Sequence, residues 1–124
     1  MDENHYSEVF VVGGFKWRIS IYPKGNNTKE YLSMYLNTAD SSTLTSESGL
    51  SRIVKFSLTV VNQLDRNKSI KTSTCKDFKD ISSGWGFREF LLLSEIRDLS
   101  KGYLVNDNVI VEAEVQFVRV ILDS

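Results

Sequence analysis

The residues whose types could carry catalysis are few and scattered along this chain of 124 residues. The one histidine, His5, lies in a polar N-terminal stretch, where a solvated side chain is more common than a general base. The one cysteine, Cys75, has no neighbouring base, and one His with one Cys cannot complete a zinc site. Glu112 and Glu114 share a strand face, but such pairs are usually solvated surface. The sequence therefore predicts a non-enzyme with no metal or cofactor.

Recognition of an extended polypeptide is a second kind of chemistry, and Gly84-Trp85-Gly86-Phe87 suggests it. Two aromatic residues spaced two apart point to one face of a strand. Gly86 between them leaves the opposite face bare, so that a second backbone can approach closely. The alternative is that Trp85 and Phe87 are core residues, as aromatic residues usually are.

Two tyrosines could join this strand in a recognition surface. Tyr35 and Tyr22 both fall on the polar side of their strands, so alternation places their rings outside. Exposed tyrosines that converge with a Trp-Gly-Phe strand would form an amphipathic patch suited to binding another protein.

Composition excludes several other partners. The net charge is −1 and the basic residues are scattered, which gives no reason to expect nucleic acid or an anionic membrane. No apolar run approaches the roughly 18 residues of a membrane span, and no secretory leader is present. A single cysteine is typical of a reduced, intracellular protein, so we expect the cytoplasm, with the nucleus as a second location.

Alternation of apolar and polar residues dominates the chain and predicts strands at 15–22, 31–37, 56–60, 69–78 and 109–120. Lys71 and Lys76 mark 69–78 as an edge strand. Val118 and Val120 shift the apolar set to the other parity, which predicts a bulge or burial on both sides. Only 90–99 has helical spacing. The prediction is an all-β antiparallel sandwich with one short helix, forming a single domain over 1–124.

Five motifs run in order along nearly the whole chain: Tyr6-Ser7-Glu8-Val9-Phe10-Val11-Val12-Gly13-Gly14-Phe15-Lys16-Trp17-Arg18, Tyr22-Pro23-Lys24-Gly25-Asn26-Asn27, Tyr31-Leu32-Ser33-Met34-Tyr35-Leu36, Gly84-Trp85-Gly86-Phe87 and Lys101-Gly102-Tyr103-Leu104-Val105-Asn106-Asp107. In these motifs the chain resembles the MATH domain, also called the TRAF-like C-terminal domain, and is most similar to its plant branch. The resemblance implies an eight-stranded antiparallel sandwich that binds short extended peptides. It also implies a role as adaptor or substrate-docking module in ubiquitin-linked or signalling assemblies.

The resemblance implies a set of peptide-binding residues. Trp85, Gly86 and Phe87 match the recognition strand of the family, Tyr35 its outward aromatic residue, Lys24 a basic position at the edge of the groove, and Val54 stands near a position that can be aromatic. Gly84 is a departure, because many members carry an aspartate there that accepts a hydrogen bond from a ligand hydroxyl.

A second departure concerns the opening strand, Phe-x-Trp-x-Ile/Val in the family, after which this chain starts. The domain is therefore expected to be N-terminally truncated relative to the family. Because that strand pairs with the last one, 109–120 would present an unpaired edge. A homo-oligomer formed through this edge, or a fold-back of residues 2–12, could cover it.

Two further functions stay open from the sequence. The chain could be the substrate-docking domain cut from a ubiquitin-specific protease. A β-sandwich carbohydrate-binding module also uses exposed aromatic residues, although the calcium or disulfide signature that usually accompanies one is lacking.

Overall fold

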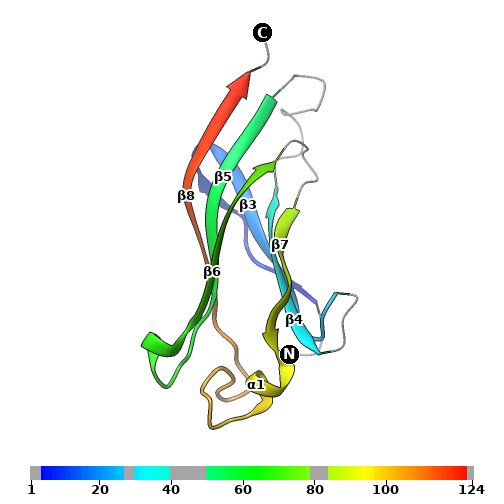
Figure 1. Cartoon of the computed structure of the whole chain (residues 1–124), viewed down its shortest axis with the longest axis vertical. Coiled ribbons are helices and arrows are strands. Elements are labelled where there is room, and N and C mark those ends of the chain that lie inside the picture. Colours follow the sequence, from blue (N-terminus) through cyan, green and yellow to red (C-terminus); the bar gives the residue numbers. More distant parts are fainter. Residues whose placement is uncertain (1–3, 27–29, 40–49, 79–83, 123–124) are drawn as a thin grey trace.

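The computed structural model describes residues 4–26, 30–39, 50–78 and 84–122. In chain order its elements are β1 (His5–Tyr6), β2 (Phe10–Val12), β3 (Phe15–Tyr22), β4 (Tyr31–Thr38), β5 (Leu50–Val60), the 3₁₀ helix η2 (Arg66–Lys68), β6 (Ile70–Phe78), β7 (Gly84–Leu92), α1 (Leu93–Arg97) and β8 (Val111–Leu122) (Figure 1). The predicted strands are all present, and β1 and β2 are short additions that alternation over two or three residues does not signal.

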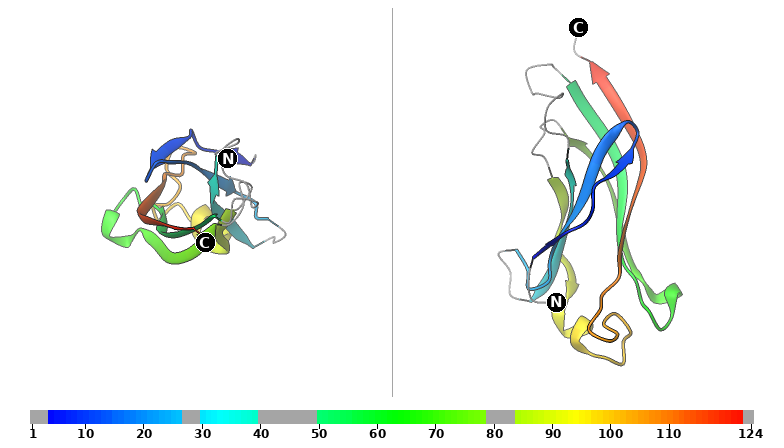
Figure 2. Two further views of the ribbon diagram at one scale, coloured as in Figure 1. Left: turned by 90° about the horizontal axis from the view of Figure 1, so that it is seen from above. Right: turned by 180° about the vertical axis from the view of Figure 1, so that it is seen from behind.

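The strands form two antiparallel sheets that pack as a sandwich (Figures 1 and 2). The first sheet has the order β1-β3-β4-β7, with β2 also paired to β3. The second sheet has the order β6-β5-β8. The predicted fold class is confirmed.

The core lies between the sheets and is built by the residues that alternation turned inward. From the first sheet come Trp17, Met34 and Leu36, and from the second Val54, Phe56 and Leu58, all fully buried. The rings of Trp17 and Phe78 meet edge to face at 5.4 Å, which joins the two sheets directly. Because apolar burial is the main favourable term in folding, this contact layer holds the two sheets together.

The parity change in the last strand is a β-bulge. Lys55 pairs with Phe117, whereas the next residue, Phe56, pairs with Val115, so Gln116 is the extra residue. Beyond the bulge Val118 faces the core and Phe117 faces outward. The predicted bulge is confirmed.

The predicted helix is shorter than its spacing indicates, because α1 covers only 93–97. Phe90, Leu91 and Leu92 continue strand β7, where Leu91 pairs with Leu32 and Leu92 with Tyr31 of β4. Pairing with β4 buries Phe90 and Leu91, and this tertiary gain outweighs the local helical preference.

The edges of the second sheet differ in character. Strand β6 is an edge, as its lysines predict. Strand β8 pairs only with β5 among the described residues. The fold-back of residues 2–12 onto β8 is wrong for the described part of that segment, because β1 and β2 pair with β3 of the other sheet.

Candidate functional site

The register between β4 and β7 decides which way the Gly-Trp-Gly-Phe residues face. Gly86 lies opposite Tyr35 and Gly84 opposite Asn37, so these four share the outer face of the first sheet. Trp85 and Phe87 lie opposite Leu36 and Met34, both fully buried, and therefore have the parity of the core. The bare face that the glycines create is thus the outer one, next to Tyr35.

The glycines bring β7 close to β4. A Cβ added at Gly86 would lie 2.2 Å from the carbonyl oxygen of Met34 and 2.5 Å from the Cα of Tyr35. Both of these atoms belong to backbone, so β7 can pair at this distance only without a side chain at position 86. A Cβ at Gly84 would meet first the side-chain amide of Asn37, at 2.1 Å, which can rotate away.

Tyrosine rings continue this face across β4, β3 and β1. The rings of Tyr35 and Tyr22 meet edge to face at 5.8 Å. Burial raises the pKa of the Tyr22 hydroxyl above its ordinary value. The charge and the hydrogen bond of neighbouring Tyr6 raise this pKa further, and so does the charge of Tyr35. The guanidinium of Arg18 lies 4.7 Å from the centre of the Tyr6 ring, a cation–π contact that covers the end of the row.

A shallow hollow of about 260 Å³ opens beside Tyr35. Its lining consists of neutral side chains and one glycine: Ser20, Tyr22, Asn26, Tyr35, Asn37 and Gly84. Asn26 donates a hydrogen bond to the Tyr35 hydroxyl at 3.3 Å, and the Ser20 hydroxyl donates to the side-chain oxygen of Asn37. The amide and hydroxyl groups can donate to and accept from an uncharged polar group.

Trp85 borders this surface at the free edge of the sheet. Its side chain is 42% exposed, and its indole N–H donates to the carbonyl of Asp77 at 3.1 Å. The ammonium of Lys76 lies 5.0 Å from the Trp85 ring. No strand pairs with the outer edge of β7 among the described residues. An open strand edge beside an exposed indole offers both backbone groups and apolar surface to a ligand.

The structure brings five of the seven predicted residues together. Tyr35, Gly84 and Gly86 share the outer face, Trp85 lies at the sheet edge, and Phe87 is half-buried against the core next to Phe90. Lys24 is exposed in the turn that follows β3, which also carries Asn26. Val54 is fully buried in β5 of the other sheet, so it is a core residue and cannot line this surface.

Sequence reasoning did not single out Tyr6, Ser20, Asn26 and Asn37 as parts of this surface. Their place depends on the register between β1, β3 and β4, and alternation within one strand says nothing about register. The one signal in the sequence was that Ser20 and Asn37 fall on the polar, outward side of their alternating strands.

Residues 4–26, 30–39, 50–78 and 84–122 hold no group of three His, Cys, Asp or Glu side chains that could bind a metal ion. In those ranges no helix has the length and apolar character needed to cross a membrane.

Comparison with known proteins assigns this chain to a family. The MATH domain family matches residues 1–115. Ubiquitin C-terminal hydrolase 12 of Arabidopsis thaliana is 54% identical over 119 residues, which are 96% of this chain and 10% of the hydrolase. A MATH domain and coiled-coil domain-containing protein of the same plant is 42% identical over 119 residues, which are 96% of this chain and 36% of that protein.

Among solved structures, Notothenia coriiceps TRAF5 matches with a TM-score of 0.65 at 14% identity, over 98% of this chain and 63% of that one, which supports the fold alone. The chain spans only a tenth to about a third of the length of these plant relatives, and the match to the hydrolase covers its MATH region alone. The family match, the plant relatives and the shared sandwich agree: this chain belongs to the MATH domain family, whose domains act as protein-interaction modules.

Proposed function

We propose that this domain binds short extended segments of partner proteins along β7 and across the adjoining outer face of the first sheet. The observation that carries the proposal is the register that sets Gly84 and Gly86 beside Tyr35 on that face. A ligand backbone can lie close to the sheet over the glycines, and the tyrosine supplies a wall against which a ligand side chain packs.

No described strand pairs with the outer edge of β7, which supports binding of the ligand as an added strand. Main-chain pairing gives such complexes general affinity, and pockets at alternate positions select side chains. One set of ligand side chains would face the neutral hollow around Tyr35 and Asn37, and the other set the exposed ring of Trp85. Short flexible peptides lose conformational freedom on binding, so we expect a dissociation constant between about 1 μM and 1 mM.

The domain would act by binding and without catalysis, as an adaptor or substrate-docking module. Its relatives named as ubiquitin C-terminal hydrolases support a place in ubiquitin-linked assemblies, where a docking domain selects the protein to be processed. We propose the cytoplasm, and the nucleus as a second location, as the compartments in which it meets its partners.

A peptide array followed by calorimetry tests the proposal. Peptides selected on the array should bind Tyr35→Ala about tenfold or more weakly than the parent, since central aromatic residues dominate such interfaces. Phe117→Ala is the control, because Phe117 is an aromatic residue, 41% exposed, on the other sheet. Equal affinity of Tyr35→Ala and the parent for every selected peptide would contradict the proposed surface.

A further inference from the structure

A second hollow, of about 610 Å³, lies at the end of the molecule formed by α1, η2 and segment 98–108 (Figure 1). It lies between the edge strands β6 and β7. Farther along these strands the Trp85 indole N–H donates to the Asp77 carbonyl, a side-chain contact between two edges that do not pair. At this end β7 leads into α1, and η2 leads into β6. The hollow opens between these two pairs of elements. We call it the end cleft.

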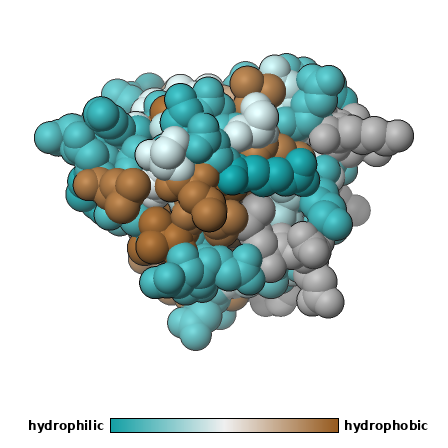
Figure 3. Space-filling model, turned by 90° about the horizontal axis from the view of Figure 1, so that it is seen from below, coloured by the Kyte–Doolittle hydropathy of each residue, from teal (hydrophilic) through white to brown (hydrophobic). Residues whose placement is uncertain are grey.

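The walls of the end cleft are mostly apolar. They comprise Tyr31, Ile70, Phe90, Leu91, Leu92 and Tyr103. Phe90, Leu91 and Tyr103 are at most 9% exposed and form a fixed base, whereas Leu92 is 38% exposed. The same end of the molecule carries a group of apolar side chains at its surface (Figure 3). A large apolar side chain entering the cleft would therefore remove further apolar surface from water.

The rim of the end cleft carries two lysines and one carboxylate: Lys68, Lys101 and Glu95. The Lys101 ammonium lies 3.5 Å from a Glu95 carboxylate oxygen, and both side chains are well exposed, so this ion pair is weak and exchangeable. No carboxylate pairs with the Lys68 ammonium among the residues that the structure describes. Asp98, the other carboxylate nearby, accepts hydrogen bonds from Ser100 and does not line the cleft.

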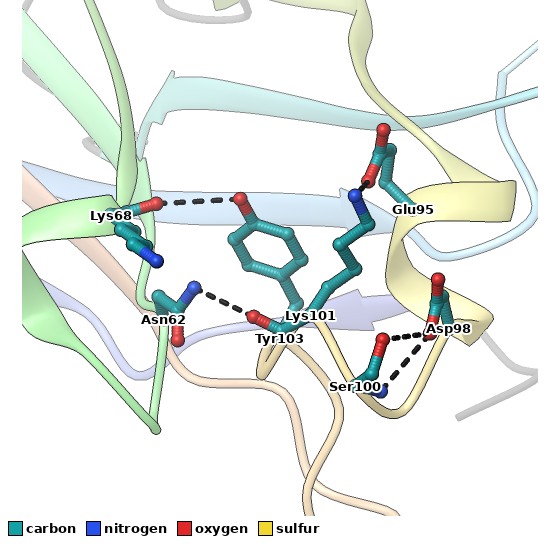
Figure 4. A network of polar contacts seen from close by, with 7 residues as sticks. All are labelled: Asn62, Lys68, Glu95, Asp98, Ser100, Lys101 and Tyr103. Carbon is teal, nitrogen blue, oxygen red and sulfur yellow. Dashed lines mark hydrogen bonds and ion pairs between the residues drawn. The ribbon is translucent and has the colours of Figure 1, made fainter.

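Hydrogen bonds fix the backbone that carries both lysines (Figure 4). The Tyr103 hydroxyl donates to the carbonyl of Lys68 at 3.3 Å. The side-chain amide of Asn62, itself 3% exposed, donates to the carbonyl of Lys101 at 2.7 Å. The backbone that carries the two lysines is therefore in place before any ligand binds, which lowers the entropy cost of binding.

We infer that the end cleft is a second peptide-binding site, which takes a large apolar side chain next to an Asp or Glu of a partner protein. The apolar side chain enters between Leu92 and Ile70, and the neighbouring carboxylate lies between the ammonium groups of Lys68 and Lys101. The excess of lysine over carboxylate at the rim selects the acidic residue. The lining of the end cleft shares no residue with the hollow beside Tyr35.

Titration of the isotope-labelled protein, followed by amide NMR, tests this inference with defined peptides. The panel consists of capped hexapeptides that place Leu, Ile, Phe or Trp next to Asp or Glu, and of matched peptides with Asn or Gln instead. At least one acidic peptide should shift the resonances of Lys68, Leu92 and Lys101 while Tyr35 and Gly84 stay unmoved. The matched amide peptide should bind several-fold more weakly, and added salt should weaken the binding of the acidic peptide.

Variants separate the charge from the apolar contribution. Lys68→Gln should lower the affinity for the acidic peptide about two- to fivefold, as expected for one exposed ion pair. The control is Lys71→Gln, at an exposed lysine of β6 outside the cleft, and it should leave this affinity unchanged. Leu92→Ser should also lower the affinity for the acidic peptide. Leu99→Ser should not, because Leu99 is 68% exposed and lies outside the lining of the cleft. The inference is overturned if no acidic peptide shifts the cleft resonances at millimolar concentration, or if amide and acidic peptides bind equally.

Discussion

Gly84 and Gly86 look equivalent in the sequence, yet they have different roles in β7. At Gly86 a side chain would collide with the backbone of β4, whereas at Gly84 it would meet the movable amide of Asn37. Neither glycine has a positive φ in the described structure, so a side chain at position 84 meets no barrier from backbone conformation. Position 84 is therefore the place where the surface can be changed without rebuilding the sheet.

The substitution Gly84→Asp should strengthen binding of serine-containing peptides. A carboxylate there would accept a hydrogen bond from the ligand hydroxyl, worth about 1.5–3 kcal/mol, once the Asn37 amide turns aside. Calorimetry with paired serine and alanine peptides measures the gain. Gly84→Asn is the control, because it has nearly the same shape without the charge. A folded Gly84→Asp variant with no gain for the serine peptide would refute the hydroxyl argument.

At the scale of elements, alternation predicted β3, β4, β6, β8 and the second half of β5, but not β1, β2 or the full length of β7. Phe15–Tyr22 was predicted with its observed bounds, and the change of parity at Val118 correctly signalled a bulge. The predicted helix start at residue 90 was wrong, because Leu91 pairs with Leu32 and so belongs to β7. Such long-range pairing cannot be seen in the local spacing of apolar residues. For the site, the outward place of Tyr35 was predicted, whereas its contacts with Tyr22 and Asn26 depend on how strands meet.

The pairing of β4 and β7 depends on Gly86, and Gly86→Ala should show this. The new Cβ would lie 2.2 Å from the Met34 carbonyl oxygen, so the strands must separate. We expect a loss of at least about 2 kcal/mol in the free energy of unfolding, toward the upper part of the range for overpacked sites. Urea denaturation measures it, with Gly84→Ala in the same strand as the control. Equal effects of the two substitutions would contradict a special role for Gly86.

At the scale of the whole molecule, the two edges of the second sheet differ. Strand β6 carries exposed lysines at 71 and 76, which discourage further pairing. Strand β8 instead exposes Phe117, Val120 and Ile121 to between 41% and 45%, and no described strand pairs with its second edge. An apolar open edge of this kind favours pairing with another strand.

We therefore expect this chain to self-associate through β8, most simply as a two-fold dimer. Sedimentation at increasing concentration should reveal dimers or larger species. Ile121→Lys should return the protein to the monomer, whereas Leu64→Lys, at an exposed apolar residue far from β8 in the sequence, should not. A clean monomer of the parent at high concentration, with the β8 amides strongly protected from exchange, would rule out an open edge.

The central claim, an extended ligand along β7 and over its glycines, is tested most directly by mapping an array-selected peptide onto the labelled protein by amide NMR. We predict that the resonances of Gly84, Trp85 and Gly86 and of Tyr35 shift together, and that the amides of β7 become more protected from hydrogen exchange. Shifts confined to the second sheet, with β7 and Tyr35 unmoved at saturation, would contradict it.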